Sequence, residues 1–141
     1  MAEVKISDLS IGDWVYHDDL VFGREIAKIH RLNKAKNGET IGITVYRSDG
    51  AFGVIGYIST FPTNNDIHPI PLTPEILEKN GIRKTYESDE YAVYKGEGFN
   101  VTEYYTELWE FERHRNRLMI RNVHQLQNAL RLAGVEKEIE V

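Results

Sequence analysis

The sequence contains no cysteine. This absence excludes disulfide bonds, thiolate chemistry and the zinc sites that need cysteine ligands. Long apolar runs are also missing, since no window approaches the roughly 20 apolar residues of a membrane-spanning helix. Residues 1–8 are mixed polar, so we expect no signal peptide. The sequence therefore predicts a cytoplasmic protein that does not enter membranes.

Basic residues are fewer than acidic ones. The 17 Lys and Arg residues against 22 Asp and Glu residues give a formal net charge of −5 at pH 7. A dedicated non-specific DNA-binding protein needs a clustered positive field, so we expect no such binding. With 141 residues and a hydrophobic fraction of 41%, the chain is long and apolar enough for one domain or two small ones.

Prolines are few, and all four lie between residues 62 and 74. Such clustering is typical of a connector rather than of the interior of a sheet. Before it, the pattern predicts strands at 11–16, 25–32, 40–46, 51–58 and 67–70, with a hairpin turn at 48–50 and bulges at Gly42, Gly53 and Gly56. Short, strongly bent strands favour an SH3-like β-barrel over residues 1–72.

The segment 73–141 has the pattern of a small α+β unit. Thr73, Pro74 and Gly81 predict a short helix with its cap, first turn and stop. Strands at 91–95, 99–104, 108–113 and 118–121 predict an antiparallel meander. A final helix is expected from Asn122 to Gly134, with a buried stripe of Val123, Leu126, Leu130 and Ala133. The predicted fold class is α+β, with both parts packed as one body.

The polar face of the final helix is the first candidate binding surface. Its members are spaced so that they align on one side of the helix: His124, Gln127, Asn128 and Arg131. Amides offer bidentate hydrogen bonding, arginine offers a cationic fork, and histidine titrates near neutral pH. The alternative is an ordinary solvated helix face.

A cation-rich turn is the second candidate. Within nine residues of this acidic chain stand Arg113, His114, Arg115, Arg117 and Arg121. Arginine forks match phosphate and carboxylate geometry, so the turn could hold an acidic partner. The alternative is cross-strand ion pairing with nearby glutamates, which contributes little at a surface.

Aromatic side chains are the third candidate. Tyr16 and Tyr46 lie on predicted strands, where their rings could contact a peptide or stack on a base. Trp14 and Phe52 have the same alternation, and for them we expect a place in the core.

Motifs of known enzymes are absent: there is no G-x-S-x-G, P-loop, H-E-x-x-H, or G-x-G-x-x-G after a strand. The tight groupings of histidine and carboxylate are 17–19 and 66–68. Each could give two oxygen or nitrogen ligands, whereas a metal site needs three or four converging groups, so we expect no metal and no cofactor. No catalytic residue is assigned.

Two motifs carry a resemblance to a known family. Ile11-Gly-Asp-Trp-Val15 has the pattern I-G-[DN]-W-V, and Val123-His-Gln-Leu-Gln-Asn128 has the pattern V-H-x-L-Q-N. With segments 70–81 and 136–141, they resemble a family of small uncharacterised proteins from Bacteroidetes and their phages and prophages. Residues 16–66 and 85–117 match in pattern only. The resemblance implies a mobile-element origin and an intracellular site of action, and it brings no activity.

These observations favour a non-catalytic binding protein, a phage or prophage accessory that engages a host or phage macromolecule. One alternative is a small-ligand binder that sequesters a nucleotide-type signal of host defence, because aromatic rings beside arginines suit bases and phosphates. Another is a small hydrolase that uses His124 or His68 with a carboxylate. A homodimer through a sheet edge is also possible.

Overall fold

The computed structural model describes residues 9–19, 23–35, 38–46, 54–60 and 67–141. The chain consists of two compact units, Met1–Ile70 and Pro71–Val141. The division lies within the predicted proline-rich connector. Packing of the two units as one body stays a prediction.

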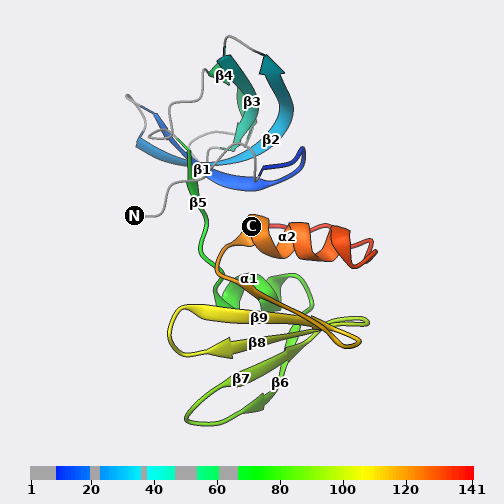
Figure 1. Ribbon diagram of the computed structural model, residues 1–141. Helices are drawn as coiled ribbons and strands as arrows, with labels where there is room; N and C mark the ends of the chain where they lie inside the picture. Colours follow the sequence, from blue (N-terminus) through cyan, green and yellow to red (C-terminus); the bar gives the residue numbers. More distant parts are fainter. Residues whose placement is uncertain (1–8, 20–22, 36–37, 47–53, 61–66) are drawn as a thin grey trace. The chain divides into compact units, whose positions relative to one another are not determined.

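The first unit contains one antiparallel sheet of five strands in the order β4-β3-β2-β1-β5 (Figure 1). Its strands are β1 (Trp14–Asp19), β2 (Gly23–Ala35), β3 (Gly38–Tyr46), β4 (Val54–Thr60) and β5 (Ile67–Pro69). The first four form a meander, and β5 then pairs with β1 on its other side. A strand was predicted at each of these places.

One face of β1 and β2 carries the core of this unit. Val15, Ala27 and Ile29 alternate along the two strands and are fully or almost fully buried, together with Leu9 and Ile67. Trp14 is on the opposite face of β1, where the Lys28 ammonium is 5.1 Å from the centroid of its ring. Trp14 is also buried, as predicted.

The first sheet is not closed into a barrel, so the predicted SH3-like β-barrel is not confirmed. Bulges were predicted at Gly42 and Gly56, but the register shifts place the extra residues next to these glycines, at His30 of β2 across from Gly42 and at Ile55 of β4 before Gly56. Gly53, Phe52 and the turn at 48–50 lie outside the described residues. Closure requires a long-range pairing of the outer strands, which local sequence patterns do not encode.

The second unit is an α+β unit with an antiparallel meander, as predicted, although the meander has five strands and four were expected. Its elements are α1 (Pro74–Lys79), β6 (Arg83–Glu87), β7 (Ala92–Lys95), β8 (Asn100–Tyr104), β9 (Leu108–Arg113), β10 (Asn116–Ile120) and α2 (Val123–Leu132). The order is β10-β9-β8-β7-β6. Strand β6 was not predicted, because all five of its residues are exposed and show no alternation of apolar and polar side chains.

Both helices begin as their sequences indicate. The hydroxyl of Thr73 accepts a hydrogen bond from the Ile76 amide at 3.3 Å, and Pro74 occupies the first turn of α1. At α2, the side-chain oxygen of Gln125 reaches back to the amides of Asn122 (3.2 Å) and Arg121 (2.7 Å). These contacts satisfy backbone donors that a helix start leaves without partners.

The core of the second unit forms between the meander and the helices. Tyr94 and Trp109 are in contact with ring centroids 5.8 Å apart, and Phe99 stacks on Phe111 at 5.5 Å. The helices contribute buried aliphatic side chains, among them Leu77, Val123, Leu126 and Leu130. In the described part of the chain, no helix has the length and apolar character that crossing a membrane requires.

Candidate functional site

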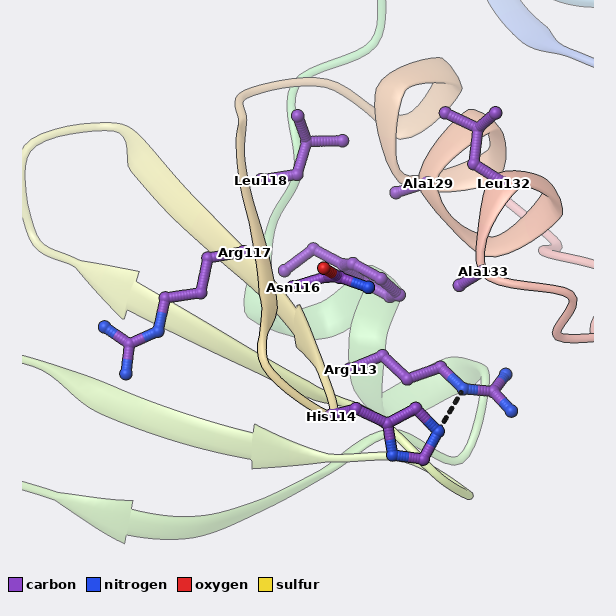
Figure 2. A pocket seen from close by; sticks show the side chains of 9 residues that line it. Arg113, His114, Asn116, Arg117, Leu118, Ala129, Leu132 and Ala133 are labelled. Carbon is purple, nitrogen blue, oxygen red and sulfur yellow. Dashed lines mark hydrogen bonds between the residues drawn. The ribbon is translucent and has the colours of Figure 1, made fainter.

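A pocket of about 410 Å³ lies between the β9–β10 hairpin and the C-terminal half of α2 (Figure 2). We call it the hairpin–helix pocket. All of its lining residues belong to the second unit: Phe111, Arg113, His114, Asn116, Arg117, Leu118, Ala129, Leu132 and Ala133. The predicted cation-rich turn and the final helix therefore meet at one site.

Strand alternation explains the wall that the hairpin supplies. Phe111 and Arg113 are on the same face of β9, and their partners across the hairpin are Leu118 and Asn116. On the helix, Ala129 and Ala133 are one turn apart and share a face. Their short side chains leave room opposite Phe111, and this difference in side-chain size gives the pocket its volume.

The cationic end of the pocket is formed by Arg113, with the His114 imidazole beside it. The Nε of Arg113 donates to Nε2 of His114 at 3.5 Å, a long hydrogen bond. His114 is the first residue of a two-residue turn and has a φ of +56°, a conformation that non-glycine residues seldom adopt. Figure 2 shows the Arg117 side chain pointing away from the helix, and its Nε is 3.9 Å from the Glu112 carboxylate.

Leucine side chains border the pocket on both walls. Leu118 of β10 is 43% exposed, and Leu132 at the end of α2 is 77% exposed. Phe111 also lines the pocket and is buried, so it forms an apolar floor. The site thus combines an apolar interior, two exposed leucines and a cationic end.

The predicted polar face of α2 is only half exposed. His124 and Gln127 are buried, at 5% and 8% exposure, whereas Asn128 and Arg131 are exposed. The prediction that all four reach solvent is wrong for His124 and Gln127, because α2 buries a wider face than its aliphatic stripe alone. Instead, α2 contributes Ala129, Leu132 and Ala133 to the lining of the pocket. Leu132 and Ala133 follow Ala129 by three and four positions, a spacing that places residues on one face of a helix.

The remaining cations of the turn are outside the lining of the pocket. Arg115 is exposed at the tip of the hairpin, and Arg121 is exposed immediately before α2. They extend the positive charge along the hairpin without contributing to the pocket wall.

The predicted aromatic candidates belong to the first unit. The Tyr16 ring is partly buried, and the Arg24 guanidinium carbon is 5.2 Å from its centroid. Tyr46 is in β3, opposite Ile26, and only its backbone is described. We expected an arginine beside an aromatic ring at a site that binds a base. Arg24 does lie beside the Tyr16 ring, but its guanidinium is bound by a carboxylate.

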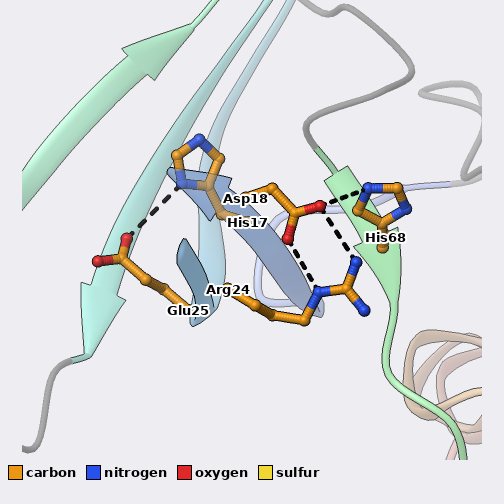
Figure 3. Close-up of polar contacts among 5 residues, drawn as sticks. All are labelled: His17, Asp18, Arg24, Glu25 and His68. Atoms are coloured by element: carbon orange, nitrogen blue, oxygen red, sulfur yellow. Dashed lines mark hydrogen bonds and ion pairs between the residues drawn. The ribbon is translucent and has the colours of Figure 1, made fainter. Parts of the chain in front are cut away.

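That carboxylate is Asp18, which binds two cationic or titratable partners (Figure 3). Its oxygens accept from Arg24 at 2.9 and 3.1 Å, and Oδ2 is 2.9 Å from Nε2 of His68. The Arg24 hydrogen bond holds the pKa of Asp18 below its ordinary value and raises the pKa of Arg24. Pairing of β5 with β1 thus brings together the predicted groupings 17–19 and 66–68, although Asp66 and the Asp19 side chain lie outside the described residues.

A second histidine–carboxylate pair lies on the opposite face of β1. Nδ1 of His17 is 3.7 Å from Oε2 of Glu25, directly across β1 and β2, and both side chains are buried. Across the described ranges, no three histidine or carboxylate side chains converge as a metal site. The contact between Asp18 and His68 joins β1 to β5, whereas the distance between His17 and Glu25 is longer than a hydrogen bond.

In comparisons with known protein families, curated proteins and solved structures, no significant match to this chain is found. The resemblance in the motifs at residues 11–15 and 123–128 therefore stays a prediction. What the chain binds has to be inferred from the geometry of its sites.

Proposed function

We propose that the protein is a non-catalytic binding protein and that the hairpin–helix pocket holds a segment of a partner protein. The observation that carries this proposal is one cavity with an apolar floor, leucine walls and a cationic end. Its volume of about 410 Å³ falls among the roughly 300–1,000 Å³ of typical ligand pockets.

The lining of the pocket indicates the chemistry of the segment. An apolar side chain would fill the space between Phe111 and Ala133 and remove apolar surface from water. A carboxylate of the same segment would be attracted by Arg113 and by the other arginines of the hairpin, whose guanidinium groups match carboxylate geometry. We therefore expect a segment in which an apolar residue adjoins an acidic one.

Two features favour a protein over a nucleotide as the partner. Phe111 is only 4% exposed, so its ring offers little open face on which a base could stack. Leu118 and Leu132 are large exposed apolar side chains on both walls, as in surfaces that bind other proteins. The nucleotide alternative depends on Arg113 and His114 as phosphate ligands.

We further propose that the chain is a phage or prophage accessory protein that acts in the cytoplasm on a host or phage macromolecule. The support for this is the motif resemblance at residues 11–15 and 123–128. The first unit would be an open form of an SH3-like barrel. Its bulged meander and the return of β5 to β1 support that proposal.

Fluorescence anisotropy with a labelled, end-blocked heptapeptide of alternating glutamate and leucine tests the pocket. We expect saturable binding, which Ala133→Leu weakens at least about tenfold, or ~1.4 kcal/mol, by filling the pocket. Asn128→Leu is the matched control, because it places the same side chain on an exposed residue of the same helix outside the lining.

Thermal-shift measurements with ATP and cyclic AMP test the alternative, in which the pocket binds a nucleotide. A nucleotide at about 100 times its Kd should raise the free energy of unfolding by ~2.7 kcal/mol. A shift that Ala133→Leu abolishes, without peptide binding, would replace the proposed partner by a nucleotide. Absence of binding by every probe would refute the pocket as a binding site.

A further inference from the structure

We infer that β10 is a docking edge, along which an extended acidic segment of the partner adds to the sheet as a further strand. Alternate side chains of that segment would then enter the hairpin–helix pocket. This inference rests on the proposed function and specifies how the partner binds.

The two edges of the second sheet differ in their protection. At β6 the register shifts between Lys84 and Tyr86, and lysine and a bulge are common means of blocking an edge. Strand β10 has an unbroken register with β9 and contains neither lysine nor proline. It instead exposes Leu118 and Met119, at 43% and 44%. Such an edge invites pairing with another chain.

The hairpin geometry identifies which backbone groups face outward. In an antiparallel pair the hydrogen-bonded residues alternate, beginning with those that flank a two-residue turn. Asn116 and Leu118 therefore bond to β9, while the N–H and C=O groups of Arg117 and Met119 point away from it. The next residue of this outward row, Arg121, accepts from the Leu72 amide at 3.0 Å, which confirms the alternation. Among the described residues, no strand pairs with β10 on this side, and the edge is bounded by the bridge between Pro71 and Asn122 that follows it.

Charge determines the occupant of this edge. Arg113, Arg115, Arg117 and Arg121, in the hairpin and just after it, outnumber its two acidic residues, Glu110 and Glu112, within an acidic chain. A second copy paired along β10 would bring these arginines together, whereas an acidic segment would neutralise them. A residue paired with Leu118 would face the pocket, and a residue paired with Arg117 would face outward. The segment should thus alternate apolar and acidic side chains, as in strand addition elsewhere.

Backbone N-methylation of the glutamate–leucine heptapeptide tests the register. The glutamates are expected to pair with Arg117 and Met119, so their amides bond to β10. N-methylation at the glutamates should lower the affinity at least tenfold, and N-methylation at the leucines should leave it within about twofold. Equal loss of affinity from both modifications, or no loss from either, would overturn strand addition.

A protein variant gives an independent test. Met119→Pro removes an outward N–H while leaving the bonds between β10 and β9 intact, because proline is tolerated on the open side of an edge strand. It should abolish heptapeptide binding, whereas Met119→Ala should retain it. If Met119→Pro fails to fold, the N-methylated peptides still decide the question.

The outcomes separate this inference from the proposed function. Binding that Ala133→Leu weakens but Met119→Pro leaves unchanged would keep the pocket and refute strand addition. Absence of binding by the unmodified heptapeptide would refute both. Light scattering adds one more outcome, since a dimer that Met119→Pro dissociates would replace the acidic segment by a second copy.

Discussion

Ala133, at the C-cap of α2, lines the same pocket as Arg113, at the end of β9. The short side chain of Ala133 leaves space in the pocket, and the guanidinium of Arg113 supplies positive charge. Because the two lie on separate elements of one unit, each contribution can be changed while the other is kept.

Replacing Arg113 by glutamine should weaken binding of the acidic heptapeptide and reduce its dependence on salt. Arg113 is on the pocket face and the glutamates of an added strand are on the other face, so its guanidinium attracts them without touching them, and charge attraction of this kind is screened by salt. Anisotropy titrations at two salt concentrations measure both effects. Arg131→Gln is the control, because Arg131 is exposed on α2 but does not line the pocket. Equal losses in the two variants would show that net charge, rather than the site, governs binding.

Glycine at position 114 should stabilise the hairpin. His114 has a φ of +56°, which strains an L-residue by about 1–2 kcal/mol, while added glycine flexibility offsets roughly half of that. Urea denaturation should therefore show His114→Gly to be more stable by about 0.5 kcal/mol. Arg115→Gly, at the neighbouring turn position without a positive φ, should be less stable than the unaltered protein. Destabilisation by His114→Gly would show that its side chain matters more than its backbone.

Alanine at position 96 should destabilise the second unit. An added Cβ would overlap the Phe99 ring, which is buried and stacks on Phe111 in the pocket floor. We expect a loss of about 1–3 kcal/mol from overpacking, measured by urea denaturation. Glu97→Ala, an exposed change in the same turn, should have little effect. Equal stability of both variants would show that Phe99 moves aside at no cost.

Stability in acid should depend on Asp18. The Arg24 hydrogen bond lowers its pKa in the folded state, below the ordinary value of 3.8. The carboxylate therefore stabilises the fold above about pH 4, and this contribution is lost as the pH falls through the lowered pKa. Asp18→Asn should be less stable at pH 7 and lose less stability than the unaltered protein between pH 5 and pH 3. Asp89→Asn, on an exposed turn, is the control. Identical pH profiles for Asp18→Asn and the unaltered protein would contradict the role of this ion pair.

Local features of the sequence predicted most of the second unit. Thr73 and Asn122 mark helix starts, and Gly81 and Gly134 mark stops, because caps and left-handed glycines depend only on neighbouring residues. The meander follows from short turns for the same reason. Strand β6 escaped prediction because an exposed edge strand needs no apolar alternation.

Long-range relationships could not be predicted in the same way. The meeting of Asp18 with His68 depends on how β5 pairs with β1. The burial of His124 depends on how wide a face α2 packs. The pocket requires small residues such as Ala133 opposite Phe111, a match in side-chain size between separate elements. The cation-rich turn was predicted as a candidate, whereas the apolar part of the site was not.

An NMR titration of the isotopically labelled protein with the glutamate–leucine heptapeptide tests the central claim most directly. The account predicts saturable shifts in the backbone amides of Phe111, Arg113, Leu118 and Ala133, with the amides of Arg117 and Met119 protected from hydrogen exchange. Shifts confined to the first unit, or no shifts at a saturating concentration, would contradict it.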